Sequence, residues 1–304
     1  MQWETLNISL VSLCEDFVTY FCTQNLQIAL IAFDFAVFTT MNDRFLKVAK
    51  QAAIEAGKII QKYSGRSLSL SLKNEDKSDF ATKADLESEE KIVKILTKNF
   101  PTHNIIAEEK NKINKGSEYT WLIDPIDGTI TFVHGIPYFS VSIGLLKNNQ
   151  PLLGVIYTIS FKHMFWAMRG KGAYLNGKKI HVSPQNVLGA AVCSLDFGHI
   201  KRRPEKIERY INPLINKIAY PYSFGSGVAT LALVGRGMLD AFVCQAWLWD
   251  FVAGAVIVRE AGGKVTDFEG KEPDWTKERL EIVASNGLIH EQILEALSPS
   301  LRGP

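Results

Sequence analysis

The sequence has few cysteines and histidines, and neither set has the spacing of a disulfide framework or a common zinc site. The four cysteines among its 304 residues show no paired spacing. Free thiols of this kind are typical of a reducing compartment, so we expect a cytoplasmic protein. The six histidines include no HxxxH pair, which argues against a helical zinc site. Internal repeats and low-complexity linkers are absent from the sequence as well.

The sequence also has little excess charge of either sign. Its 34 Lys and Arg against 32 Asp and Glu give a net charge of +2, which argues neither for nor against an anionic partner. The one basic run, at 201–209 (KRRPEKIER), is interrupted by two glutamates. Such a run is typical of a solvated loop and helix start rather than of a nucleic-acid contact. A hydrophobic content of 46% is enough for a substantial core.

Residues 1–40 differ from the rest of the chain. The apolar stretch at 17–38 has no basic segment before it and no clear cleavage site, which argues against a signal peptide. Asp34, in its only dense apolar run, argues against a membrane span. We therefore expect 1–40 to be an extension outside the fold. The fold itself is expected over 41–304, with one half at about 41–185 and a second α/β half at about 186–304.

Helical and strand patterns alternate from Met41 onward, which predicts an α/β fold. Helices are expected over 43–63, 85–98, 204–216, 226–235, 250–261 and 288–297. Strands are expected near 67–72, 104–107, 120–124, 138–146, 152–158, 163–168, 190–195, 239–243 and 281–284. Asn176-Gly177 predicts a hairpin turn between 173–175 and 178–180.

The most informative segment, 121–129 (WLIDPIDGT), holds two carboxylates three residues apart at the end of an apolar run. Asp124 is expected at the carboxyl end of a buried strand, where open α/β sheets bind ligands. Pro125 fixes the backbone there, and Gly128 allows another group to approach closely. A helix beginning near Gly128 would direct free N–H groups at an anion. Taken alone, the segment is compatible both with a Mg²⁺ site and with a simple turn.

Two further acidic segments favour the metal site. The run at 105–109 (IIAEE) ends in carboxylates, and Asp250 begins an apolar helix pattern that closes on Gly262-Gly263. A first-turn aspartate can also be a simple helix cap. A turn or a helix cap can account for each acidic segment alone, but no single structural role of this kind accounts for all three. Together they predict oxygen ligands for a hard cation.

These segments resemble the inositol monophosphatase family of Mg²⁺-dependent, lithium-sensitive phosphatases. The resemblance extends from about Met41 to the end of the chain, and it rests on 107–109 (AEE), 121–134 (WLIDPIDGTITFVH) and 249–263 (WDFVAGAVIVREAGG). It implies the layered α/β/α/β/α sandwich of the inositol monophosphatase and fructose-1,6-bisphosphatase type. It also implies two or three Mg²⁺ ions, hydrolysis of a small phosphomonoester by metal-activated water, and a homodimer. Nucleic-acid and membrane partners are not expected.

The resemblance further implies a role for each matching residue. Asp124 would bridge two ions, Thr129 would help to orient the attacking water, and the N–H groups of Gly128 and Thr129 would hold the phosphate. The metal ligands would be Glu108, Asp124, the carbonyl of Ile126, Asp127 and Asp250. The catalytic set would be Glu108, Thr129 and Asp85, and the substrate-binding set would be Gly128, Thr129, Gly225, Ser226, Gln245 and Asp250.

Departures from the family pattern concern the substrate. Ile130-Thr131 follows the central motif where the family usually has Thr-Asn, and 222–224 (YSF) replaces an arginine often found before Gly225. Gln245 stands near the position where many inositol-hydrolysing members carry a glutamate. The substrate therefore stays open between myo-inositol 1-phosphate, another sugar phosphate, histidinol phosphate and a 3′-phosphonucleotide. A regulator that binds the transcription machinery is the alternative of another class.

A protein shortened to begin at Met41 is expected to fold and to be as active as the full chain, because the helical periodicity and the resemblance both begin there. Removal of an apolar segment should also improve solubility. The measurements are the thermal midpoint and the Mg²⁺-dependent rate of both proteins. An insoluble or clearly less stable shortened protein would contradict this expectation.

Overall fold

The structure is a computed structural model that describes residues 43–65, 70–72 and 80–301. The chain forms two compact units, Met1–Lys47 and Val48–Pro304. Of the smaller unit, only the start of a helix at 43–63 is described, and the boundary expected at residue 40 lies outside the described residues. The boundary expected near 185 falls within the larger unit, between the last strand of one sheet and the first of another.

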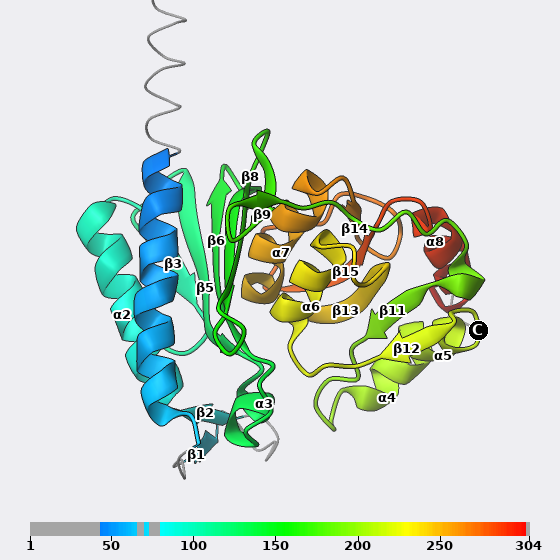
Figure 1. Cartoon of the computed structure of the whole chain (residues 1–304), viewed down its shortest axis with the longest axis horizontal. Coiled ribbons are helices and arrows are strands. Elements are labelled where there is room, and N and C mark those ends of the chain that lie inside the picture. The colour runs from blue at the N-terminus through cyan, green and yellow to red at the C-terminus, as the bar shows by residue number, and fades with distance from the viewer. Residues whose placement is uncertain (1–42, 66–69, 73–79, 302–304) are drawn as a thin grey trace, which may run out of the picture. The chain divides into compact units, whose positions relative to one another are not determined.

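Helices and sheets alternate in layers within the larger unit (Figure 1). The first helix, from residue 48 on, and α2 (Lys83–Asn99) cover one face of an eight-stranded sheet. Helices α6 (Gly227–Gly235) and α7 (Leu248–Glu260) lie between that sheet and a five-stranded sheet. Helix α8 (His290–Leu301) covers the far face of the second sheet. The predicted α/β/α/β/α sandwich is confirmed.

The two large sheets differ in their strand directions. The first is antiparallel except where β3 and β5 run parallel, and in the second β11 runs parallel to both of its neighbours. The order of the first sheet is β10 (Lys178–Lys179), β9 (Gly172–Leu175), β8 (His163–Met168), β7 (Gln150–Thr158), β6 (Ser140–Lys147), β5 (Tyr119–Asp127), β3 (Asn104–Ala107) and β4 (Lys112–Ile113). The order of the second is β12 (Tyr220–Tyr222), β11 (Val192–Leu195), β13 (Ala241–Trp247), β15 (Arg279–Ser285) and β14 (Lys264–Thr266).

Shorter elements connect these layers. A two-stranded ladder precedes α2, and short helical segments follow β5, β10 and β11. No helix in the described ranges is long and apolar enough to cross a bilayer. The two cysteines in the same ranges, Cys193 and Cys244, are free thiols, as expected. The remaining elements are β1 (Leu70–Leu72), β2 (Phe80–Thr82), α3 (Thr129–Val133), a 3₁₀ turn (Leu188–Ala190), α4 (Arg203–Lys206), a π-helical turn (Ile207–Ile211) and α5 (Asn212–Ile215).

The sequence pattern predicts that strand β5 ends at Asp124, but the strand continues beyond this residue. Its pairing with β6 continues to Asp127, with an irregularity between Asp124 and Asp127. Pro125 lies in that interval, where a residue without an N–H group removes no ladder hydrogen bond. The irregularity is consistent with a bulge, which redirects side chains at a strand end. Both aspartates are therefore held by the sheet rather than by a free turn.

The helix predicted over 204–216 is present over 203–215, but its form changes twice, from α to π and back to α. The N–H of Asn212 donates to the carbonyl of Ile207, five residues back, which is the π-helical pattern. Pro213 has no N–H group to donate to the carbonyl four residues earlier, so the regular ladder cannot continue through it. The short strands β4, β12 and β14 were not predicted, because two- and three-residue strands have too little periodicity to recognise.

Helix α7 is apolar on all sides because it is buried between the two sheets. It approaches the first sheet most closely at two glycines that face each other across β6 and β7, Gly144 and Gly154. A Cβ atom on Gly154 would lie 2.1 Å from the carbonyl oxygen of Ala253, and one on Gly144 would lie 2.7 Å from a Val252 methyl. These glycines set the spacing between α7, which carries Asp250, and the strand that carries Asp124.

Replacement of Gly154 by valine is expected to lower the free energy of unfolding by about 3 kcal/mol or more, because the new side chain would press on the α7 backbone. The measurement is thermal or denaturant unfolding of the variant. Gly189→Ala is the matched control, since a Cβ atom there meets nothing within 4 Å. A Gly154→Val protein as stable as the control would contradict the close approach.

Candidate active site

Four acidic residues meet where β3, β5 and α7 end or begin. The parallel pairing of β3 with β5 places Ala107 beside Ile123, and the N–H of Glu108 donates to the carbonyl of Ile123 at 3.1 Å. Glu108 and Asp124 are therefore neighbours, because each directly follows one member of the paired residues Ala107 and Ile123. Asp127 lies at the end of β5, and Asp250 lies in the first turn of α7. The structure thus brings together all four acidic side chains that the sequence predicts as metal ligands.

The electrostatics of this cluster are unfavourable without a positive charge. Asp124 is 2% exposed, and burial raises its pKa well above the usual value. The negative charges of Glu108, Asp127 and Asp250 raise it further, as does a hydrogen bond with the Glu108 side chain. Burial, followed by the charges of Glu108 and Asp127, likewise raises the pKa of Asp250. In the described part of the chain, no Lys or Arg lies at ion-pair distance from Asp124, Asp127 or Asp250.

A cation fits this donor set. The Oδ1 atom of Asp124 is buried and has no hydrogen-bond partner among the described residues. An unpartnered buried carboxylate oxygen is costly, and a hard cation such as Mg²⁺ would satisfy it. Within the same residues, however, no three acidic, histidine or cysteine side chains form a closed metal-ligand cluster. Asp127 and Asp250 both accept hydrogen bonds from the protein.

Asp127 is bound to the first turn of α6. Its carboxylate accepts hydrogen bonds from the Ser226 hydroxyl and from the N–H groups of Gly227 (3.1 Å) and Val228 (3.0 Å). Burial raises the pKa of Asp127 to about 6, and the hydrogen bonds from Ser226, Ala229 and Val228 oppose that rise. Ser226 also caps α6 by accepting from the N–H of Ala229 at 3.3 Å. The sequence predicts Ser226 and Gly225 as substrate-binding residues, and no pattern in it indicates the hydrogen bond from Ser226 to Asp127.

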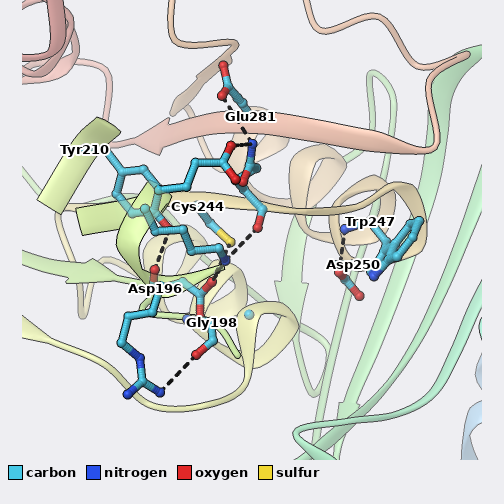
Figure 2. Close-up of polar contacts among 12 residues, drawn as sticks. Asp196, Gly198, Tyr210, Cys244, Trp247, Asp250 and Glu281 are labelled. Carbon is cyan, nitrogen blue, oxygen red and sulfur yellow. Dashed lines mark hydrogen bonds and ion pairs between the residues drawn. The ribbon is translucent and has the colours of Figure 1, made fainter. Parts of the chain in front are cut away.

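Asp250 is fixed by the backbone of the preceding strand. Its Oδ2 atom accepts a hydrogen bond from the N–H of Trp247 at 2.8 Å (Figure 2). Each carboxylate oxygen has two lone pairs, so Asp127 and Asp250 can accept from the protein and still bind a cation. The protein contacts of these two residues therefore orient predicted ligands rather than remove them.

Thr129 and Asp85 come together beside the cluster, as predicted. The Thr129 hydroxyl lies 3.3 Å from Oδ1 of Asp85 and 3.0 Å from the carbonyl oxygen of Ile126. Asp85 is buried, and its Oδ2 accepts from the N–H of Thr82 at 2.8 Å in the capping box of α2. Gly128, just before α3, has φ +86, and a Cβ atom there would lie 2.7 Å from the Thr131 hydroxyl. This position therefore requires glycine.

Gln245 lies in a neighbouring polar cluster, which also contains Asp196, Lys206, Arg209 and Glu281; Figure 2 labels Asp196 and Glu281 in this cluster. Its Nε2 atom is 3.2 Å from Glu205 and 3.4 Å from Glu281, and its Oε1 is buried without a partner among the described residues. The buried Lys206 pairs with Asp196 and donates to the Gln245 carbonyl at 2.8 Å. The negative charge of Asp196 raises the pKa of Asp250, so the two clusters adjoin. The proposed contact of Gln245 with substrate stays a prediction.

Glu89 is a functional candidate that the sequence analysis missed. This side chain is 1% exposed and accepts hydrogen bonds from the N–H groups of Glu109 (2.7 Å), Lys110 (2.9 Å) and Asn111 (3.0 Å). It therefore fixes the turn directly after Glu108. The available signal was its position four residues after Asp85, which places both carboxylates on one face of α2.

The chain is similar to known proteins over most of its length. The model of the inositol monophosphatase family matches residues 41–302. A fructose-1,6-bisphosphatase/inositol-1-monophosphatase of Aquifex aeolicus is 34% identical over 257 residues, which cover 83% of this chain and 94% of the relative. The Nus factor SuhB of Pseudomonas aeruginosa is 34% identical over 267 residues, which cover 84% and 96%.

A solved structure of an inositol monophosphatase also matches this chain. The inositol monophosphatase of Thermotoga maritima superposes with a TM-score of 0.75 at 34% identity, over 86% of this chain and 98% of that chain. The matched region includes the three acidic segments on which the resemblance was based. The chain belongs to the inositol monophosphatase family of phosphatases.

Proposed function

We propose that the chain hydrolyses a small phosphomonoester in a Mg²⁺-dependent reaction, with myo-inositol 1-phosphate or a related sugar phosphate as substrate. The observation that carries the proposal is the Oδ1 atom of Asp124, which is buried without a hydrogen-bond partner among the described residues. The charges of three other carboxyl groups act on the same side chain. The name of the Aquifex aeolicus relative, fructose-1,6-bisphosphatase/inositol-1-monophosphatase, supports the choice of substrates. A panel of phosphomonoesters, tested for phosphate release with and without Mg²⁺, examines the proposal directly.

Glu108, Asp124, the Ile126 carbonyl, Asp127 and Asp250 would hold two or three Mg²⁺ ions. When bound, Mg²⁺ would polarise the phosphoryl oxygens, lower the pKa of a bound water and neutralise charge on the leaving oxygen. The role of the protein is to hold the ligands in position before the substrate binds. The α6 N–H groups do this for Asp127, and the Trp247 N–H does it for Asp250.

Thr129 and Asp85 would orient the attacking water. The Asp85 carboxylate accepts from Thr82 with its other oxygen, which leaves Oδ1 directed at the Thr129 hydroxyl. A hydroxyl that donates its one hydrogen bond to Asp85 can still accept a hydrogen bond from a water molecule through its lone pairs. That hydrogen bond would fix the water so that its oxygen faces the phosphorus.

A second function is a regulatory contact with the transcription machinery. It is favoured by one observation, the relative in Pseudomonas aeruginosa that carries the name Nus factor. Co-purification of this chain with RNA polymerase would test it separately from phosphate release. A homodimer and a cytoplasmic location also belong to the proposal, and they rest on the family resemblance and on the cysteine content.

Asp124→Asn is expected to lower turnover at saturating Mg²⁺ by more than about a hundredfold, because each bridged cation loses a charged ligand. The measurement is the steady-state rate of phosphate release. Asp274→Asn, an exposed aspartate away from the cluster, is the matched control. A near wild-type rate for Asp124→Asn would show that this residue does not bridge the ions.

Glu89→Gln is expected to raise the Mg²⁺ concentration for half-maximal activity roughly ten- to hundredfold, because the turn after Glu108 loses a charged acceptor. Its rate at saturating Mg²⁺ should change much less. Glu87→Gln is the control, since Glu87 lies on the same helix and faces Lys83 at the surface. A folded Glu89→Gln protein with an unchanged Mg²⁺ requirement would refute the positioning role.

A further inference from the structure

Helix α7 begins without the side-chain acceptor that usually caps a helix. Its N-cap residue is Trp247, which has no side-chain oxygen, whereas serine, threonine, aspartate and asparagine are preferred at this position. The reverse contact is present, because Asp250 in the first turn accepts a hydrogen bond from the N–H of Trp247 at 2.8 Å (Figure 2). This contact uses one oxygen of a predicted metal ligand. The geometry of that ligand therefore depends on what holds the transition from β13 to α7.

Three side chains, Arg279, Trp247 and Trp249, form a stack at this transition. The rings of Trp247 and Trp249 lie 5.1 Å apart at an interplanar angle of 10°. The guanidinium carbon of Arg279 is 4.4 Å from the centroid of the Trp247 ring, and the two residues are cross-strand partners in β13 and β15. The backbone is tied to the same strand, since the N–H of Leu248 donates to the carbonyl of Glu278 at 2.8 Å. The Trp247 stack thus joins the end of β13 and the first turn of α7 to β15.

Arg279 contributes to the stack at a cost. Its Nε is buried without a hydrogen-bond partner among the described residues, where no carboxylate lies at ion-pair distance from it either. Arg259 differs, because it lies 5.6 Å from the Trp275 ring but pairs with Glu272 at 2.8 Å. A buried N–H without an acceptor is unfavourable, whereas a guanidinium over a tryptophan ring is stabilised by the π-system. The contact with Trp247 is therefore the interaction that offsets this cost for Arg279.

We infer that the Trp247 stack positions the carboxylate of Asp250 for metal binding. By holding the end of β13 against the first turn of α7, the stack keeps the Trp247 N–H directed at one oxygen of Asp250 and leaves the remaining lone pairs for a cation. Trp247 and Arg279 act as positioning residues, because they would act on the metal through Asp250. This inference rests on the proposed function, which makes Asp250 a Mg²⁺ ligand.

The test is Mg²⁺ binding to the full chain, measured by calorimetry without substrate. Trp247→Leu removes the ring at unchanged charge and should raise the Mg²⁺ dissociation constant roughly ten- to hundredfold. Trp247→Phe keeps an aromatic ring and should stay within about threefold of the wild type. Thermal midpoints show whether each variant is folded.

Trp166→Leu is the matched control. Trp166 also stacks on an aromatic ring, that of Tyr174 at 4.3 Å, and it lies 3.8 Å from the cation of Lys50. Its strand, β8, is separated from β5 by β7 and β6. The control therefore loses the same kind of stack away from the carboxylates, and its Mg²⁺ affinity should equal that of the wild type.

Arg279→Ala separates the stack from its charge. Burial and then the charge of Arg202 lower the pKa of Arg279, while Asp250 acts in the opposite direction, so the charges of Arg279 and Asp250 interact. Loss of a positive charge near the site would by itself strengthen the binding of a cation. Loss of the stack should instead weaken Mg²⁺ binding, by roughly three- to thirtyfold. The two effects have opposite signs, and the inference predicts weaker binding.

Equal or tighter Mg²⁺ binding by folded Trp247→Leu or Arg279→Ala would overturn the inference, and Arg279→Ala decides alone if Trp247→Leu does not fold. Equal weakening by Trp166→Leu, or no recovery in Trp247→Phe, would also overturn it. A wild-type protein that binds Mg²⁺ but releases phosphate from no phosphomonoester refutes the proposed hydrolysis and leaves this test intact. A wild-type protein that binds no Mg²⁺ contradicts Asp250 as a ligand and overturns the positioning role as well.

Discussion

Mutual repulsion among four carboxyl groups is the constraint on which the rest of the site depends. Asp124 is buried, and the charges of Glu108, Asp127 and Asp250 all act on it. Like charges at short range in a poorly solvated site raise each other's pKa and destabilise the folded state. Cations that bind between the carboxylates would reverse the sign of these interactions. This arrangement of carboxylates lowers the stability of the metal-free protein, and for the same reason it would bind Mg²⁺ strongly.

The fold supports this arrangement with separate contacts for separate ligands. Glu89 fixes the turn after Glu108 from the buried face of α2. The N-terminal turn of α6 fixes Asp127 at the end of β5. Because α6 and α7 pack on each other between the two sheets, the helix that fixes Asp127 is in contact with the helix that carries Asp250. The layered architecture thus keeps groups together that would otherwise separate.

The sequence predicts the site better than it predicts the contacts that hold it. Asp124, Asp127 and Asp250 could be recognised because each ends or begins an apolar pattern, a local signal. The hydrogen bond from Ser226 to Asp127 joins residues 99 positions apart, and no pattern within either segment reports it. The continuation of β5 to Asp127 likewise depends on its pairing with Ser140 in β6. Long-range pairing of this kind overrides the local turn signal of Pro125.

Binding of Mg²⁺ to the full chain, measured by calorimetry in the absence of substrate, tests the account most directly. If the four carboxylates form a metal site, the protein should bind at least two ions, and Asp124→Asn should lose or weaken that binding while the variant remains folded. A wild-type protein that binds no Mg²⁺, or an Asp124→Asn protein that binds it equally well, would contradict the assignment of the carboxylate cluster as the metal site.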